Sequence, residues 1–194
     1  MDLRPRAFNH TLYMNIGIPN SGKSTFSNSL TCAAFEDLRI SLDDNANCLK
    51  ILSTDMLIEE IATLCNVTYN EAFQDLVKFS EKMMYKKLAK CIVQKDTIVW
   101  DQTNVSKKIR KTKLSYIPSD YRRVALYFPI DMNKALHRNV KRFEKVLPEK
   151  ILIDMNKKLE APTYDEGFDD IFVIRQNCNA INGYNVSRET EKVV

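Results

Sequence analysis

Short apolar runs alternate along the chain with longer segments in which apolar residues recur at helical spacing. The runs lie at Thr11–Gly17, Leu49–Leu52, Asp96–Asp101, Arg123–Phe128 and Asp170–Ile174, and their length is typical of buried strands. The spacing between them predicts helices over Lys23–Phe35, from Thr68 past Ile92, from Ser106 to before Pro118, from Asp131 onward and from Pro148 to about Leu159. Strands that alternate with helices predict an α/β fold, in which a parallel sheet is covered by helices on both faces.

The longest of these helices has a clear start signal. Thr68 and Glu71 have the spacing of a capping box, in which each side chain bonds to the backbone amide of the other residue. The stripe of Met and Phe residues that follows is interpreted as core.

Three of the expected strands end at polar residues, which are Gly17, Asp55 and Asp101. Ligands of parallel α/β sheets bind beyond the carboxyl ends of the strands. We therefore expect these three residues to face one crevice.

The segment GIPNSGKST, residues 17–25, matches the pattern G-x-x-x-x-G-K-[ST] between an expected strand and an expected helix. That context is typical of a P-loop, whose backbone amides wrap the phosphates of a nucleotide. Lys23 would neutralise the β- and γ-phosphate oxygens, and Ser24 would bind Mg²⁺. The candidate nucleotide contacts are therefore Gly17, Asn20, Ser21, Gly22, Lys23, Ser24 and Thr25.

Two carboxylates at strand ends are candidates for roles in phosphoryl transfer. Asp101 ends an apolar strand, where P-loop enzymes hold a carboxylate beside Mg²⁺. Asp55 follows Ser53 and Thr54, and as a general base it could orient an acceptor hydroxyl and take its proton. Structural roles stay open, because a strand-end Asp also caps turns and Asp55 could be the N-cap of a helix over Met56–Leu64.

Arg138 and Arg142 are four residues apart, so on a helix they share one face. Two guanidinium groups on one face can clamp the negative charge of a transferring phosphoryl group. A solvated basic face is the other interpretation of the pair. His137 has no partner that the sequence reveals, and a surface or packing role is favoured for it.

Charge is unevenly distributed along the 194 residues. Residues 105–145 carry twelve basic and three acidic side chains, although the net charge of the chain is only +4. Such a block predicts a positive surface that attracts a polyanion, whereas two solvated amphipathic helices would explain it without a ligand. The five cysteines include no C-x-x-C pair, which disfavours a disulfide framework or a cysteine zinc site.

Targeting signals are not visible in the sequence. No sustained apolar segment follows Met1–Ala7, and the run around Leu12–Ile18 is too short to span a bilayer. The chain is therefore expected to be intracellular, without a membrane partner, and a homo-oligomer stays open. Residues 1–174 are expected to form one domain, followed by a polar tail over 175–194.

Five segments combine into a more specific pattern. They are GIPNSGKST, the strand end STD, VWDQTN with Arg110 six residues later, HRNVKR followed by LPEKIL, and EAPTYDEGFDDIFVI. Together they resemble the kinase domain of bacteriophage-type polynucleotide kinases, over roughly residues 11–174. The resemblance implies a P-loop kinase fold with a helical lid, located in the cytoplasm of a bacterium or a phage-infected cell. It implies transfer of the γ-phosphoryl group of ATP, with Mg²⁺, to the 5′-hydroxyl end of DNA or RNA.

The resemblance assigns roles position by position. Lys23 and Ser24 match nucleotide and metal contacts, Asp55 matches the general base, and the lid arginines are matched by Arg138 and Arg142. The acceptor-side contacts would be Asp55, Asp101, Thr103, Asn104 and Arg110, with Asp101 also near the metal.

One position departs from the family pattern. The family usually has an Arg three residues after the base, where this chain has Ile58, and Arg110 or Lys107 is the candidate replacement. The phosphatase signature D-x-D-G-T and the ligase signature K-x-D-G are absent, so the resemblance implies a stand-alone kinase.

Two other functions compete with this interpretation. A kinase that acts on a nucleoside, nucleotide or sugar would share the P-loop, the base and the lid arginines, but it would not need the basic block. A nucleotide-binding regulatory protein without turnover would not need Asp55, Asp101 and the arginines together.

Overall fold

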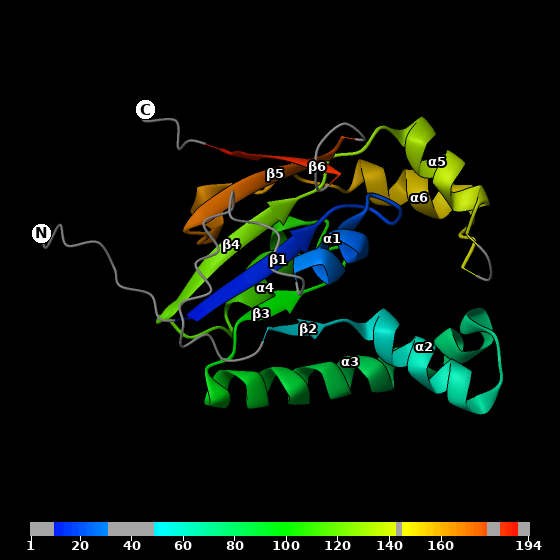
Figure 1. Cartoon of the computed structure of the whole chain (residues 1–194), viewed down its shortest axis with the longest axis horizontal. Helices are drawn as coiled ribbons and strands as arrows, with labels where there is room; N and C mark the ends of the chain where they lie inside the picture. Colours follow the sequence, from blue (N-terminus) through cyan, green and yellow to red (C-terminus); the bar gives the residue numbers. More distant parts are fainter. Residues whose placement is uncertain (1–9, 31–48, 143–144, 178–182, 190–194) are drawn as a thin grey trace, which may run out of the picture.

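The computed structural model describes residues 10–30, 49–142, 145–177 and 183–189. In chain order its strands are β1 (His10–Ile16), β2 (Lys50–Leu52), β3 (Ile98–Trp100), β4 (Tyr121–Tyr127), β5 (Asp170–Gln176) and β6 (Tyr184–Arg188). They form one sheet in the order β2-β3-β1-β4-β5-β6 (Figure 1). The first five strands are parallel and β6 is antiparallel to β5, which confirms the predicted α/β class.

The helices of the described residues are α1 (Lys23–Leu30), α2 (Thr54–Cys65), α3 (Tyr69–Gln94), α4 (Lys107–Leu114), α5 (Met132–Val140) and α6 (Glu149–Lys157), with a 3₁₀ turn at Tyr164–Glu166. The helix expected over Lys23–Phe35 is described as far as Leu30, and its last five positions lie outside the described residues. None of the helices described is both long and apolar enough to cross a membrane.

The predicted capping box at the start of α3 is confirmed. The Thr68 N–H donates to Glu71 Oε2 at 2.8 Å, and the Glu71 N–H donates to Thr68 Oγ1 at 3.3 Å. Two amides that the helix itself leaves unpaired are thereby satisfied. This start places Tyr69 as the first residue of α3.

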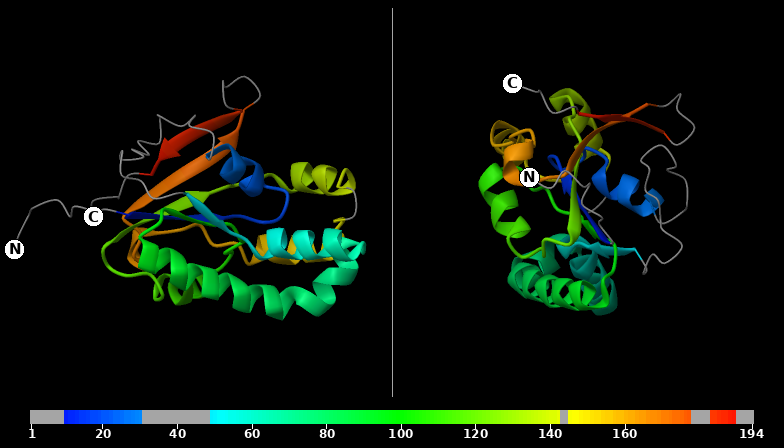
Figure 2. Two further views of the ribbon diagram at one scale, coloured as in Figure 1. Left: turned by 60° about the horizontal axis from the view of Figure 1, so that its bottom comes forward. Right: turned by 90° about the vertical axis from the view of Figure 1, so that its left-hand side faces the viewer.

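The sheet separates two apolar layers. On β1, Leu12, Met14 and Ile16 pack with residues of α3 and α4, whereas Tyr13 packs on the other face with Phe26 of α1. This alternation follows from the two-residue period of a strand. Figure 2 shows α1 on one side of the sheet and α3 with α4 on the other.

The chain beyond Ile174 contributes to the sheet, although the sequence indicated only a polar tail from residue 175. β5 continues to Gln176, and β6 pairs with it from Tyr184 to Arg188. The Tyr184 ring meets the Phe26 ring of α1 edge-on at 5.1 Å. β6 is polar because it is an edge strand with exposed side chains, so it shows no continuous apolar run.

Candidate active site

The loop between β1 and α1 is tightly folded around its two glycines. A Cβ at Gly17 would lie 2.8 Å from Ser21 Oγ and 2.9 Å from the Phe128 carbonyl oxygen. Gly22 has φ +95°, and a Cβ there would lie 2.5 Å from Gln176 Nε2. A side chain at Gly17 would therefore clash with Ser21 and the Phe128 backbone, and one at Gly22 would strain the backbone, because L-residues rarely adopt this φ.

A cavity of about 410 Å³ opens beside this loop. Its walls come from the P-loop, the first turn of α2, the segment after β3, α5 and the end of β5. They are formed by Pro19, Asn20, Gly22, Lys23, Ser24, Thr25, Ser53, Asp55, Asp101, Gln102, Thr103, Arg138, Arg142 and Gln176. The fold thus brings together the P-loop, both strand-end carboxylates and both arginines that the sequence singled out.

Lys23 lies at the base of the cavity. Its Nζ donates to the Ile18 carbonyl oxygen at 2.7 Å and to Ser21 Oγ at 3.4 Å. Burial lowers the Lys23 pKa to about 8, and the charges of Asp101 and Asp55 partly oppose this shift. A triphosphate in the cavity would stabilise the charged ammonium further, because an anion at contact distance favours the cation.

Asp101 is held by the interior of the sheet. Asn15, a fully buried residue of β1, donates its side-chain amide to Asp101 Oδ1 at 2.8 Å and to Ser27 Oγ at 2.7 Å. Asp101 is 6% exposed. The hydrogen bond from Asn15 therefore fixes its Oδ1 on the side of the sheet interior. This arrangement favours a site role for Asp101 over a simple turn cap.

Asp55 does not cap α2, because Ser53 is the N-cap and its Oγ accepts from the Met56 N–H at 3.4 Å. Asp55 instead lies in the first turn of α2 and faces the cavity. Its Oδ1 accepts a hydrogen bond of 3.0 Å from the Tyr69 hydroxyl.

The two arginines contact the P-loop through Asn20. Arg138 Nη1 donates to the Asn20 carbonyl oxygen at 3.0 Å, and Arg142 Nη1 donates to Asn20 Oδ1 at 3.0 Å. Arg138 also bonds to Gln176 at the end of β5. Both guanidinium groups line the cavity. Arg138 lies on α5, whereas Arg142 follows the end of this helix at Val140, so the two do not share a helix face as the sequence predicted.

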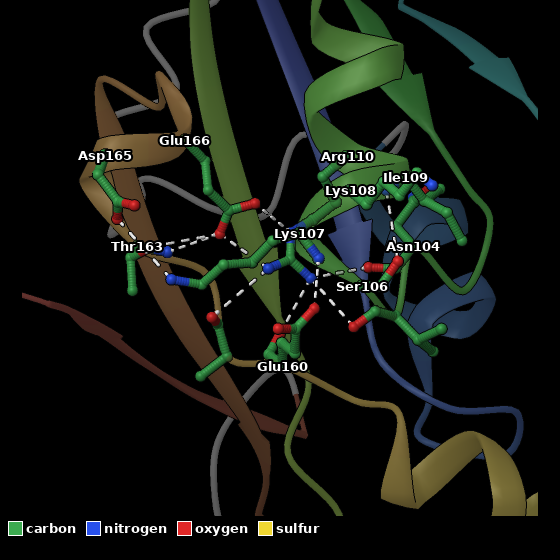
Figure 3. A network of polar contacts seen from close by, with 12 residues as sticks. Asn104, Ser106, Lys107, Lys108, Ile109, Arg110, Glu160, Thr163, Asp165 and Glu166 are labelled. Atoms are coloured by element: carbon green, nitrogen blue, oxygen red, sulfur yellow. Dashed lines mark hydrogen bonds and ion pairs between the residues drawn. The ribbon is translucent and has the colours of Figure 1, made fainter.

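Arg110 is not an acceptor contact in this structure. It is fully buried, and its Nε and Nη2 form a two-pronged ion pair with Glu166 at 2.7 and 2.8 Å (Figure 3). Its Nη1 donates to the carbonyl oxygens of Asn104, Val105 and Glu160. The guanidinium therefore joins the start of α4 to the 3₁₀ turn, and the predicted substrate role is replaced by a structural one.

Asn104 is structural as well. It has φ +47°, is 2% exposed, and donates its side-chain amide to the Asn15 carbonyl oxygen at 2.7 Å while Lys113 donates to its Oδ1 at 2.6 Å. Its neighbour Thr103 does line the cavity. Of the acceptor-side segment, Asp101, Gln102 and Thr103 thus face the site, and Asn104 fixes the turn behind them.

Ile58 packs into the contact between α2 and α3 and is fully buried. Neither suggested replacement for an Arg at this position reaches the cavity. Arg110 forms an ion pair with Glu166, and Lys107 forms one with Asp165, with 3.9 Å between Nζ and Oδ1.

Part of the basic block of residues 105–145 is paired or buried. Arg110, Arg122 and Lys145 pair with Glu166, Asp170 and Glu59 respectively. Lys113 is buried, which lowers its pKa to about 8. Among the residues that line the cavity, only Arg138 and Arg142 come from this block.

Replacing Arg110 with methionine is expected to destabilise the fold by about 3–5 kcal/mol, because Glu166 would stay buried without its cation. Chemical denaturation followed by circular dichroism measures the change. Lys108, which is exposed on the same helix, is the control, and its replacement with alanine is expected to leave stability unchanged. An unchanged denaturation midpoint for Arg110→Met would contradict the structural role.

The sequence did not indicate three residues of this region: Tyr69, Gln102 and Gln176. Gln102 donates to Thr54 Oγ1 at 3.2 Å and accepts from the Trp100 indole at 2.9 Å. Tyr69 and Gln176 reach the site only because α3 and β5 fold beside it. Gln102, within the segment VWDQTN, is the one for which a sequence signal existed.

A family model described as an AAA domain matches residues 12–162. Among solved structures, Kti12 of Chaetomium thermophilum in complex with ADP-AlF3 has a TM-score of 0.58 at 16% identity, over 89% of this chain and 93% of that chain. The PezAT toxin–antitoxin system of Streptococcus pneumoniae has a TM-score of 0.53 at 12% identity, over 89% and 70%. These likenesses show the fold alone. No curated protein sequence matches the chain.

Proposed function

This chain belongs to the AAA domain family, and we propose that its P-loop kinase-type domain transfers the γ-phosphoryl group of ATP to the 5′-hydroxyl end of DNA or RNA. The observation that carries the kinase chemistry is the meeting of Lys23, Asp55 and the two arginines in one cavity. The nucleic-acid acceptor is supported by the resemblance of five sequence segments to polynucleotide kinases. ATP as the donor is supported by the P-loop, and Kti12, which shares the fold, was solved with ADP-AlF3.

The residues of the cavity divide into a donor side and an acceptor side. The P-loop, Lys23 and the arginines would hold the triphosphate and neutralise the charge of the transferring group. Asp55 would accept the proton of the acceptor hydroxyl. The acceptor oxygen then bonds to the γ-phosphorus, the bond from that phosphorus to its bridging oxygen breaks, and ADP leaves with the electron pair.

The donor side fits a magnesium ion that is bound together with nucleotide. Ser24 and Asp101 line the cavity, and in the described ranges no cluster of three or more His, Cys, Asp or Glu side chains could hold a metal alone. Mg²⁺ favours this donor set, because it takes few protein ligands and completes its shell with phosphate oxygens and water. When bound, the ion would neutralise charge on the β- and γ-phosphates.

The test is transfer of label from γ-labelled ATP to a 5′-hydroxyl oligonucleotide, beside a panel of nucleosides, nucleotides and sugars. Label at oligonucleotide ends in DNA or RNA is the expected result. Label on panel compounds alone would identify a small-molecule kinase instead. That outcome has some structural support, because Lys107, Lys108 and Lys111 do not line the cavity. Nucleotide binding without turnover on any acceptor would indicate a regulatory protein.

The variant Asp55→Asn is expected to lower turnover by about 10²-fold or more, the contribution of a general base. Its affinity for ATP should change little, because Asp55 is assigned here to the acceptor side. Steady-state kinetics and nucleotide titration separate the two effects, with Glu60→Gln on the same helix as the control. A collapse of nucleotide affinity in Asp55→Asn would assign Asp55 to the donor side.

A further inference from the structure

Asp55 has a neighbour that no sequence motif includes. Tyr69, the first residue of α3, donates its hydroxyl to Asp55 Oδ1 at 3.0 Å. The carboxylate is thus anchored at one oxygen, and its second oxygen can accept from a substrate hydroxyl. Burial and the negative charge of Asp55 raise the Tyr69 pKa, so the phenol stays protonated and acts as a donor.

The Tyr69 ring is itself in contact with a lysine. Lys145, which follows α5, places its Nζ 4.1 Å from the centre of this ring and forms an ion pair with Glu59 of α2. Such a cation–π contact is favoured where the cation is partly desolvated. Burial lowers the Lys145 pKa, and the charge of Asp55 opposes that shift, which places the ammonium within the field of the carboxylate.

Two residues after α5 contact different parts of the site. Arg142 bonds to Asn20 of the P-loop, and Lys145 contacts Tyr69 and Glu59. Lys145 thus contacts the tyrosine that bonds to Asp55, while Arg142 contacts the P-loop.

We infer that Tyr69 is the positioning residue for Asp55, and that Lys145 holds Tyr69 in place so that the carboxylate meets an acceptor hydroxyl with one free oxygen. The inference rests on the kinase chemistry proposed above, but not on which hydroxyl is the acceptor. Neither residue transfers a proton or touches the phosphoryl group.

The first experiment follows Asp55 itself, without turnover. The side-chain carboxyl carbon of Asp55 is observed by NMR at neutral pH in protein with labelled aspartate, and the signal is assigned by its loss in Asp55→Asn. The position of this signal depends on the hydrogen bonds that the carboxylate oxygens accept, so it should shift in Tyr69→Phe, where the bond of 3.0 Å is lost. Tyr116→Phe, which removes a hydroxyl from a tyrosine that is 53% exposed, is the matched control. An unmoved Asp55 signal in Tyr69→Phe would overturn the inference.

The comparison must leave the charged groups near Asp55 unchanged. The charge of Asp55 acts on Lys23 of the P-loop and on Lys145 after α5. Tyr69→Phe keeps the ring and its contact with Lys145, so only the hydroxyl is lost.

The second experiment uses whichever acceptor the wild-type protein phosphorylates. Tyr69→Phe should lower kcat by about tenfold with an unchanged KM for ATP. Lys145→Ala should lower kcat several-fold alone but add little in the Tyr69→Phe background, because both act on one contact. The exposed lid residue Lys141, replaced with alanine, is the control.

The outcomes separate this inference from the proposed function. If the wild type phosphorylates no 5′-hydroxyl end but the Asp55 NMR signal shifts in Tyr69→Phe, the acceptor assignment fails and the positioning role stands. If transfer occurs and Tyr69→Phe changes neither the Asp55 signal nor kcat, the positioning role fails. Fully additive effects of Tyr69→Phe and Lys145→Ala would refute the link between the two residues.

Discussion

Replacing Lys23 with alanine is expected to abolish phosphoryl transfer and to leave the protein folded. Lys23 is the cation of the P-loop and lies at the base of the cavity, where it would neutralise the β- and γ-phosphate oxygens. No other lysine lines this cavity, so none described could replace its charge. Transfer of γ-label, measured beside nucleotide binding, gives the result, and the exposed residue Lys134, replaced with alanine, is the control. Full activity in Lys23→Ala would remove the P-loop from the mechanism.

The same variant should be at least as stable as the wild type without nucleotide. Burial lowers the Lys23 pKa from 10.5 to about 8, so below about pH 8 the folded state carries the full cost of a buried charge. This cost is relieved as the pH rises from about 8 toward 10.5, where the unfolded chain also loses the proton. The melting temperature of Lys23→Ala relative to the wild type should therefore be highest at neutral pH. A large loss of stability at pH 7 would instead assign Lys23 a structural role through its bond to Ile18.

The variant Arg142→Lys is expected to lower turnover by about 10³-fold, the low end of the effect of an arginine finger. The Arg142 guanidinium lines the cavity and is aimed by Asn20 Oδ1 at 3.0 Å. A planar guanidinium can contact two phosphate oxygens at once, whereas an ammonium acts as a point charge, so lysine should rescue poorly. Single-turnover kinetics with saturating nucleotide measures the chemical step.

Arg138→Lys is the matched comparison for this prediction. Arg138 already bonds to the Asn20 carbonyl and to Gln176, so it should contribute less to the transition state than Arg142. Near-wild-type turnover of Arg142→Lys with intact nucleotide binding would reject the clamp and favour the alternative of a solvated basic face.

The sequence was informative for features that depend on residues close together in the chain. The P-loop is one continuous segment, and its spacing already implies a strand, a tight loop and a helix. The capping box at Thr68 and Glu71 is local too, and its two hydrogen bonds are present. Asp55 and Asp101, which follow β2 and β3, could be placed in one crevice because parallel topology brings the carboxyl ends of strands together.

Residues whose roles depend on distant partners could not be assigned in this way. Arg110 lies near the acceptor segment in sequence, but Glu166, 56 positions later, captures it in the interior. The basic block 105–145 has an excess charge in sequence, yet Glu59, Glu166 and Asp170 from other segments neutralise part of it.

The sequence by itself determined the fold class, the phosphate-binding loop and the candidate base, because each depends on short-range periodicity or on the order of strands. Only the tertiary structure decided that Arg110 is buried, that β6 completes the sheet, and that Tyr69 bonds to Asp55 while Lys145 contacts the Tyr69 ring. The physical reason is that burial and ion pairing are set by which segments meet in space. The sequence around a charged side chain does not show whether that side chain will contact water or pair with a buried carboxylate.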